Sequence, residues 1–212
     1  MEKYSVEQLP ELFEGAAAVF AEKKEELCTM DANMGDGDLG LTMNKGFGAL
    51  PDFIRQNTEE GNAGKTLMKA AMKMAALVPS TMGTLMSSGI MEGGKALKGC
   101  AEFGAPELAA FLQGFADGVQ KRGKCEPGDC TILDALIPAA EKASAAAGAG
   151  ESLAGVITKA LEGAREGVEA TKGMIPKFGK AAVFSAKASG IADQGATAAM
   201  YLLEGLRRSI CG

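Results

Sequence analysis

Apolar residues recur at intervals of three and four along almost the whole chain, and this spacing restricts the fold more than any other feature. Near the amino terminus it runs through Leu9, Leu12, Phe13, Ala16 and Phe20. Residues at this spacing share one face of an α-helix, so each such stretch predicts an amphipathic helix. Runs rich in valine and isoleucine, which strands favour, are nearly absent. The sequence therefore predicts an all-α protein.

The predicted helices are separated by residues that begin or end helices. Asn62, Ser80 and Ser152 stand at expected helix starts, and glycines stand near several expected ends. No repeat or long linker divides the chain, so we expect a single domain over residues 1–212. Helices without strands predict an up-and-down bundle or a closed barrel of about eight antiparallel helices. The expected helical segments are 6–28, 40–57, 63–78, 82–98, 106–122, 131–147, 151–172 and 194–210.

Charge and hydropathy narrow the class of protein. The net charge of -5 argues against a protein that binds nucleic acid by neutralising its phosphates. No apolar run approaches the ~18–20 residues needed to cross a membrane. The acidic, amphipathic start also differs from the basic start and apolar stretch of a signal peptide. We therefore expect a cytoplasmic protein without nucleic-acid or membrane partners.

The chain contains no histidine. This excludes a Ser-His-Asp or Cys-His nucleophile system, a histidine metal site and a phosphohistidine relay on this chain. The cysteines are odd in number and scattered, which predicts reduced thiols rather than a disulfide framework. A group that transfers protons must therefore be a carboxylate here, or belong to a partner.

Three aspartates, Asp31, Asp36 and Asp38, alternate with glycines in DANMGDGDLGLTMNKGF, residues 31–47. Glycine costs about 1 kcal/mol relative to alanine inside a helix, so a loop that aims several carboxylates at one point is expected. Carboxylates without sulfur or imidazole suit Mg²⁺, Ca²⁺ or Mn²⁺. The helix starting near Leu39 would offer free N–H groups to an anion. The alternative is a simple turn in which Asp38 caps that helix.

Two further segments follow, and the first of them allows both a chemical and a structural interpretation. In VPSTMGTLMSSG, residues 78–89, small side chains would let a phosphate approach backbone amides, or Ser80 or Thr81 would cap a helix. RGKCEPGDCTILDAL, residues 122–136, predicts a turn followed by a helix with Asp134 in its first turn.

A fourth segment, KFGKAAVFSAKASGIADQGAT, covers residues 177–197 and is rich in lysine. Lys177, Lys180 and Lys187 would neutralise a phosphate, or would belong to a solvated basic loop. Asp193-Gln194-Gly195 follows them.

Taken in order, the four segments resemble the nucleotide-binding L subunit of dihydroxyacetone kinases over nearly the whole chain. Residues 35–40 are similar to the family's GDxDxG metal loop, with Asp31 upstream. Residues 122–131 are similar to its RGK-x-EPGD-x-T segment, and residues 179–197 to its G-[RK]-A…D-x-G-A-T segment. The resemblance implies a closed barrel of eight antiparallel helices that binds nucleotide at one end.

The resemblance also implies the ligands and the residues that hold them. Two magnesium ions would be held by Asp31, Asp36 and Asp38, and they would bind the phosphates of ADP or ATP. The other contacts that it implies are Leu39, Gly40, Leu41 and Thr42 with Asn44 nearby, then Pro79, Ser80 and Thr81 at the phosphates, Gly123 and Ile132 near the base, Lys180 in place of an arginine, and Asp193, Gln194 and Gly195 in the last loop.

Two departures from the family lie at the expected phosphate site. Many members have histidine where this chain has Leu39, and GASGPLFGT where it has PSTMGTLMS. Leu39 would still offer its backbone N–H but no side-chain contact. The ketose, with three or four carbons, therefore stays open.

The implied activity is phosphoryl transfer to a hydroxyl of a short-chain ketose. In the family, a histidine of a separate K subunit holds the ketose covalently, so this chain would be the nucleotide half and active only with that partner. ATP would exchange as substrate, which we slightly favour, or ADP would stay bound and be rephosphorylated by a phosphotransferase-system protein. A homodimer, a regulatory subunit that contacts a transcription regulator without turnover, and a calcium-binding helical protein without nucleotide are further alternatives.

Overall fold

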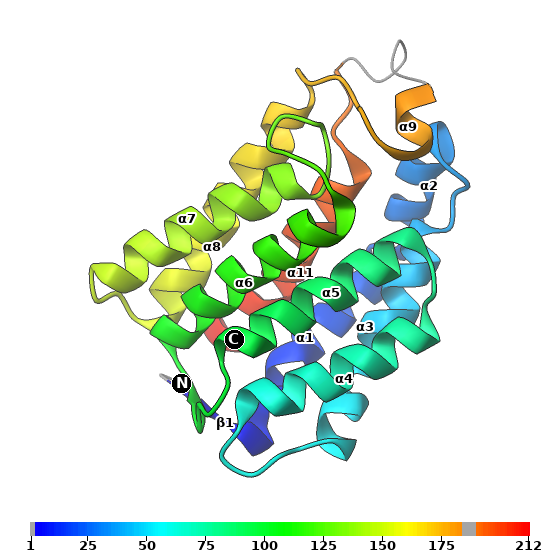
Figure 1. Cartoon of the computed structure of the whole chain (residues 1–212). Coiled ribbons are helices and arrows are strands. Elements are labelled where there is room, and N and C mark those ends of the chain that lie inside the picture. Colours follow the sequence, from blue (N-terminus) through cyan, green and yellow to red (C-terminus); the bar gives the residue numbers. More distant parts are fainter. Residues whose placement is uncertain (1–2, 184–189) are drawn as a thin grey trace.

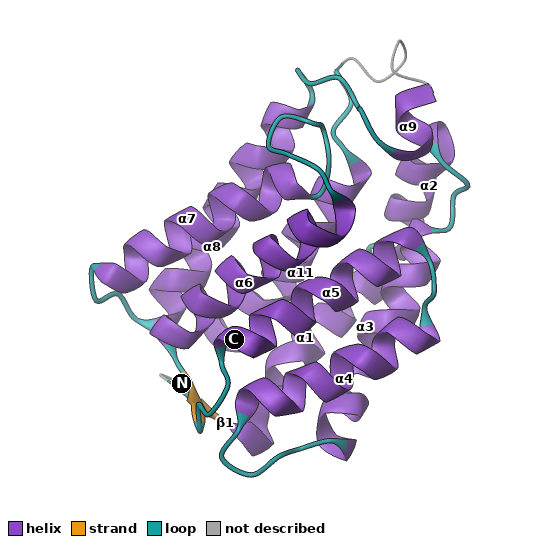
Figure 2. Cartoon of the chain, viewed as in Figure 1, coloured by secondary structure: helices purple, strands orange, loops and turns teal. Residues whose placement is uncertain are grey.

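The computed structural model describes residues 3–183 and 190–212, apart from the side chains of Met34, Lys180 and Ala181. Most of this part of the chain is helical (Figure 2). None of its helices is long and apolar enough to span a lipid bilayer. The helices are α1 (Leu9–Glu22), α2 (Lys24–Met34), α3 (Leu39–Gln56), α4 (Ala63–Leu77), α5 (Thr81–Ala96), α6 (Ala105–Gly123), α7 (Leu133–Gly148), α8 (Leu153–Thr171), α9 (Gly179–Val183) and α11 (Gln194–Cys211), with a 3₁₀ turn at Val6–Gln8.

Eight of these helices form a closed ring in the order α1, α3, α4, α5, α6, α7, α8 and α11. Each packs against the next, and α11 packs back against α1 (Figure 1). Successive helices run in opposite directions, so every second connection lies at the same end of the ring. The prediction of an all-α barrel of antiparallel helices is confirmed.

The amino-terminal segment differs from its prediction in two ways. The helix expected over 6–28 is broken at Lys23, and α2 packs on α3 and α11 instead of continuing α1. Asp31 therefore stands in the last turn of a helix rather than in a loop. The structure also contains a short strand pair, in which β1 (Tyr4–Ser5) lies antiparallel to β2 (Glu102–Phe103). A break inside the charged, helix-favouring stretch around Lys23 has no sequence marker.

Phenylalanine side chains fill the centre of the ring. Phe13 of α1 meets Phe111 of α6 edge to face, with ring centroids 6.2 Å apart, although these helices lie on opposite sides of the ring. Phe20 and Phe47 stack with centroids 4.6 Å apart. Such aromatic pairs contribute packing energy beyond the area they bury. The interior of the ring is therefore a packed core, and the cleft described below lies at one end of the ring.

The helices that close the ring, α1 and α11, touch through glycine. A Cβ atom on Gly205 would lie 2.3 Å from Cα of Ala16, and one on Gly15 would lie 2.2 Å from the carbonyl oxygen of Gly205. Larger residues would hold the two backbones apart.

A buried aspartate begins the last helix. The Asp193 carboxylate accepts a hydrogen bond from the N–H of Ala196 at 2.7 Å, and the Asp193 N–H donates to Thr171 Oγ1 at 2.9 Å. Burial raises the pKa of Asp193 to about 7; the charge of Asp134 adds to this effect, and the N–H groups of Ala196 and Gly195 oppose it.

We expect Gly205→Ala to lower the free energy of unfolding by about 1–3 kcal/mol or more, because the added methyl group meets backbone that has little room to move. Gly48→Ala is the matched control, since a Cβ at Gly48 meets no atom within 4 Å. Its helix propensity predicts a gain of up to about 1 kcal/mol. Urea unfolding measures both variants, and equal stability of Gly205→Ala and the wild type would contradict the close packing.

We also expect a pH-dependent effect of Asp193→Asn. Between its usual pKa of 3.8 and about 7, the folded protein holds a proton on Asp193 that the unfolded chain has released. The contribution of this group to stability is thus present at low pH and is lost as pH rises through 7. In EDTA, the variant should gain about 2–4 kcal/mol relative to the wild type between pH 4 and 8. A difference independent of pH would rule out the raised pKa.

Candidate functional site

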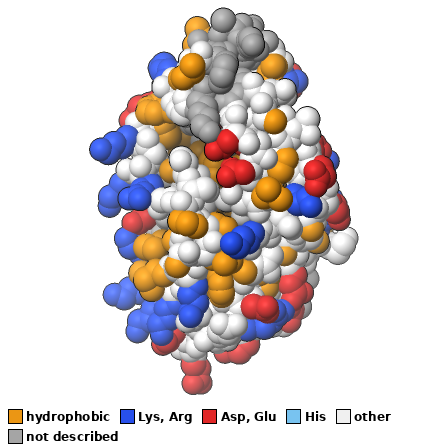
Figure 3. Space-filling model, turned by 90° about the vertical axis from the view of Figure 1, so that its right-hand side faces the viewer, with side chains coloured by type: hydrophobic (Ala, Val, Ile, Leu, Met, Phe, Trp, Pro, Cys, Tyr) orange, Lys and Arg blue, Asp and Glu red, His pale blue; other side chains and the backbone are white. Residues whose placement is uncertain are grey.

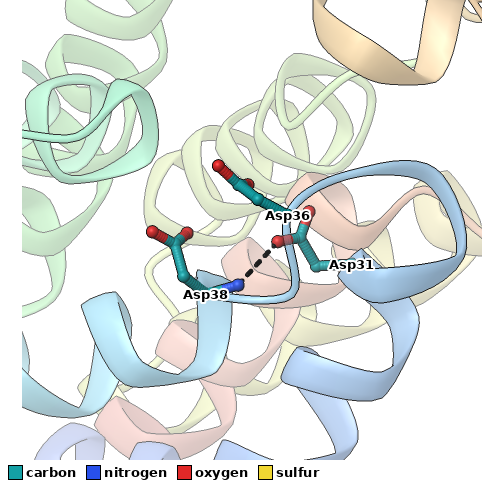
Figure 4. Close-up of side chains that lie close together, drawn as sticks. All are labelled: Asp31, Asp36 and Asp38. Atoms are coloured by element: carbon teal, nitrogen blue, oxygen red, sulfur yellow. Dashed lines mark hydrogen bonds between the residues drawn. The ribbon is translucent and has the colours of Figure 1, made fainter.

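The Asp31 carboxylate fixes the aspartate loop to the start of α3. Its Oδ2 atom accepts hydrogen bonds from the backbone N–H groups of Gly37 at 2.9 Å, Asp38 at 3.0 Å and Leu39 at 3.3 Å. Figure 4 shows the one from Asp38. Asp31 is only 8% exposed. One oxygen of this carboxylate is thus held by the positive end of α3, which favours negative charge.

The glycines of this loop are required by its geometry. A Cβ on Gly35 would lie 2.1 Å from Oδ1 of Asp31, and Gly37 has a φ of +78°. Side chains at these positions would displace the carboxylate or strain the backbone.

Asp31, Asp36 and Asp38 converge at the end of the ring (Figure 4). Each offers one carboxylate oxygen, and these oxygens all lie within 4.8 Å of one another. Oxygens bound to one Mg²⁺ at about 2.1 Å lie up to about 4.2 Å apart, so small rotations of the exposed Asp36 and Asp38 would complete the set. Asp38 stands at the N-cap position of α3, but its side chain makes no capping hydrogen bond. The oxygen donors therefore fit a hard cation better than a simple cap.

Contacts with α11 and α3 position the helix that carries Asp31. The Tyr201 hydroxyl donates to the Glu26 carboxylate, and the Lys23 ammonium lies 5.1 Å from the centre of the Tyr201 ring. Burial and the neighbouring Glu26 raise the pKa of Tyr201 to about 12. A Cβ on Gly40 would lie 1.9 Å from the carbonyl oxygen of Lys24, so Gly40 allows α2 and α3 to approach.

A cleft extends from the aspartates across the end of the ring. It consists of two adjoining cavities of about 520 and about 500 Å³. The first contains the three aspartates, and the second reaches Arg122, Gly123 and Cys125. Residues that line both cavities are Pro79, Ser80, Thr81, Leu85, Thr131, Ile132, Phe178 and Gly179.

Two buried aspartates shape the connection between α6 and α7. Asp134 accepts hydrogen bonds from the N–H groups of Gly128 at 2.5 Å and Thr131 at 2.7 Å. Asp129 accepts one from the N–H of Glu126 at 2.7 Å and pairs with the Lys177 ammonium at 2.6 Å. This ion pair lowers the pKa of Asp129. Hydrogen bonds from backbone N–H groups to these two carboxylates therefore fix the conformation of the loop.

Cys130 lines the first cavity but is not poised to react. It has a φ of 59°, and its thiol faces the carbonyl oxygen of Thr171 at 3.6 Å. Burial, with the charges of Asp193 and Asp134, raises the pKa of Cys130 to about 12. It stays a neutral thiol at physiological pH and is no nucleophile. All cysteines are free, as predicted.

Ser80 fits both interpretations of residues 78–89, as a helix cap and as part of a phosphate site. Its hydroxyl accepts a hydrogen bond from the N–H of Gly83 at 3.0 Å and so caps α5. It also lines both cavities.

The cleft brings together most of the residues expected from the sequence. Gly40 faces α2, Leu41 is 56% exposed, and Asn44 lines neither cavity. Lys187 and the side chain of Lys180 lie outside the described residues. Besides the aspartates, the expected residues that line the cleft are Leu39, Thr42, Pro79, Ser80, Thr81, Gly123, Ile132, Asp193, Gln194 and Gly195.

Several lining residues were not identified from the sequence. Leu85 lies one turn after Thr81, so helical spacing alone would have placed it in the cleft. Phe178 comes from the connection after α8, and no pattern marked it. On the face shown in Figure 3, acidic side chains lie beside hydrophobic ones in the upper half.

Several curated proteins named as kinases or kinase subunits are similar to this chain in sequence. The ADP-binding subunit DhaL of the PEP-dependent dihydroxyacetone kinase from Escherichia coli is 27% identical over 186 residues, which cover 88% of each chain. Human triokinase/FMN cyclase is 29% identical over 183 residues, and the D-erythrulose kinase of Mycolicibacterium smegmatis is 31% identical over 186. The chain spans about a third, 32%, of the length of these two relatives.

A solved structure supports the fold. The dihydroxyacetone kinase of C. freundii, in complex with AMP-PNP and Mg²⁺, matches with a TM-score of 0.68 at 22% sequence identity, over 94% of this chain and 33% of that one. The family model described as the DAK2 domain matches residues 33–208. This chain therefore belongs to the DAK2 domain family.

Proposed function

We propose that this chain is the nucleotide-binding subunit of a dihydroxyacetone-type kinase. It would bind ADP or ATP with magnesium and serve phosphoryl transfer to a short-chain ketose held on a separate K subunit. The observation that carries the proposal is the cleft, with three convergent aspartates in one cavity, Gly123 in the adjoining one and Ile132 lining both. Each cavity lies within the ~300–1,000 Å³ typical of small-molecule sites.

The aspartates Asp31, Asp36 and Asp38 would hold the metal, as two ions if the family pattern applies. Magnesium would neutralise charge on the phosphate groups and on the phosphoryl group in transfer. Without a cation, these carboxylates would repel a polyphosphate. Nucleotide binding should therefore depend strongly on magnesium.

Helix starts would receive the phosphates. The cavity that holds the aspartates is lined by Leu39, Thr81 and Gln194, the first residues of α3, α5 and α11. Backbone N–H groups and the positive helix ends at such positions favour anions. The apolar side chains of Leu85 and Ile132 would then contact the base.

The composition of the chain supports a separate partner, and the names of its relatives leave two phosphate donors open. The chain has no histidine to hold a ketose covalently. Relatives that it covers at 88% and 91% of their length are named ADP-binding subunits of PEP-dependent kinases. Its other relatives are named triokinase and erythrulose kinases. Retention of labelled ADP on dilution would indicate ADP as a bound cofactor, whereas rapid exchange would indicate ATP as substrate.

Asp36→Ala should abolish magnesium-dependent nucleotide binding, because it removes one ligand from the metal set. Titration calorimetry with ATP, with and without magnesium, measures this. Circular dichroism should show an intact fold, since Asp36 is exposed. Asp117→Ala, an exposed change on α6, is the control and should bind as the wild type does. Unchanged ATP affinity in Asp36→Ala would refute the metal assignment.

The purified chain should phosphorylate neither dihydroxyacetone nor erythrulose by itself. Activity should appear when its cognate K subunit is added with the phosphate donor. A coupled assay for ketose phosphate tests this. Robust activity of the chain alone would disprove the proposal that the ketose is held on a separate subunit. Nucleotide binding without activity in the complete mixture would favour a regulatory role.

A further inference from the structure

The segment after α8 forms part of the cleft wall but is poorly packed. We call residues 175–183 the strap. Phe178 and Gly179 of the strap line both cavities, as does Thr81 at the start of α5. Ile175 is 69% exposed, Phe178 42% and Val183 80%. Ile175 and Val183 therefore bury little apolar surface, and the apolar contribution to holding the strap comes from the buried Pro176 and part of Phe178.

Lys177 supplies the polar ties between the strap and another segment in the described part of the chain. Its backbone N–H donates to the carbonyl oxygen of Asp129 at 3.1 Å, and its ammonium lies 2.6 Å from Asp129 Oδ1. Only the second of these depends on the side chain. The ion pair is thus the tie that a substitution can remove.

Asp129 gives the strap a rigid point of attachment. Its carboxylate is buried and accepts the N–H of Glu126 at 2.7 Å. The same loop is fixed by Asp134 through the N–H groups of Gly128 and Thr131. A strap joined to this loop cannot move away from the cleft without breaking the ion pair.

We infer that Lys177 is a positioning residue, whose ion pair with Asp129 holds the strap over the nucleotide cleft and slows nucleotide release. This rests on the proposed nucleotide-binding function. Lys177 acts through Phe178 and Gly179, which follow it directly and line the cleft. Loss of the pair should raise the dissociation rate, while the association rate stays the same or rises.

The test measures the release of a fluorescent ADP analogue with magnesium by stopped flow, after a chase with excess ADP. Lys177→Met should dissociate about 10-fold faster, and Lys177→Arg should remain close to the wild type. Asp129→Asn retains an oxygen for the Glu126 N–H and should also release faster. The double variant should match the single ones, because both changes break the same pair. Lys142→Met is the control: it removes a 2.6 Å pair with Glu166 between α7 and α8, and neither residue lines the cleft.

Other results of these release measurements would contradict either the proposed function or the role of Lys177. If the wild type fails to bind the analogue, the proposed function fails. If the wild type binds and Lys177→Met releases at the same rate, the positioning role is wrong. If Lys177→Met releases faster but Asp129→Asn releases more slowly, Lys177 contacts the phosphates directly and the inference is overturned. Equal acceleration in Lys142→Met would show a general loss of stability instead.

Discussion

Closure of the helix ring is the constraint on which the rest of the structure depends. Gly15 and Gly205 let α1 and α11 touch backbone to backbone, and Phe13 and Phe111 meet across the centre. In a closed ring of antiparallel helices, every second connection must lie at the same end. Segments separated by about two helices in sequence are therefore brought together, and the cleft forms where they meet.

The cleft is acidic, although its proposed ligand is an anion. Asp31 and Asp193 of its lining are buried, and backbone N–H groups donate hydrogen bonds to their carboxylates. Asp36 and Asp38 are exposed, and they extend the same negative surface into the cavity. A polyphosphate approaches such a surface only with cations between them. The charge of this surface is therefore the physical reason why the proposed nucleotide binding should require a metal ion.

Helices marked by apolar periodicity could be predicted from the sequence, whereas features without a local sequence marker could not. The helix expected over 63–78 is observed at 63–77, because apolar periodicity and the Asn62 cap both mark it. The break at Lys23 lies in a stretch with uniform helix propensity, so nothing local marks it. The family pattern implies Gly40 at the phosphates, whereas in the structure it lines neither cavity, and a Cβ there would meet the carbonyl oxygen of Lys24. The short spacing of the aspartates was enough to expect their convergence, although Asp31 lies in α2 and not in a loop. The place of Phe178 in the cleft wall depended on the path of the strap, which no local pattern marks.

The position of the chain ends has a consequence for domain architecture. Tyr4 of β1 donates a hydrogen bond from its hydroxyl to the carbonyl of Ser209 near the end of α11, at 2.9 Å. In Figure 1 both ends lie away from α2 and α9, which carry the cleft residues Asp31 and Gly179. A polypeptide tether attached at either end would therefore leave the cleft unobstructed. The same geometry suits a freestanding subunit and a module fused within a longer enzyme, and the relatives include matches to about a third of a chain and to nearly a whole one.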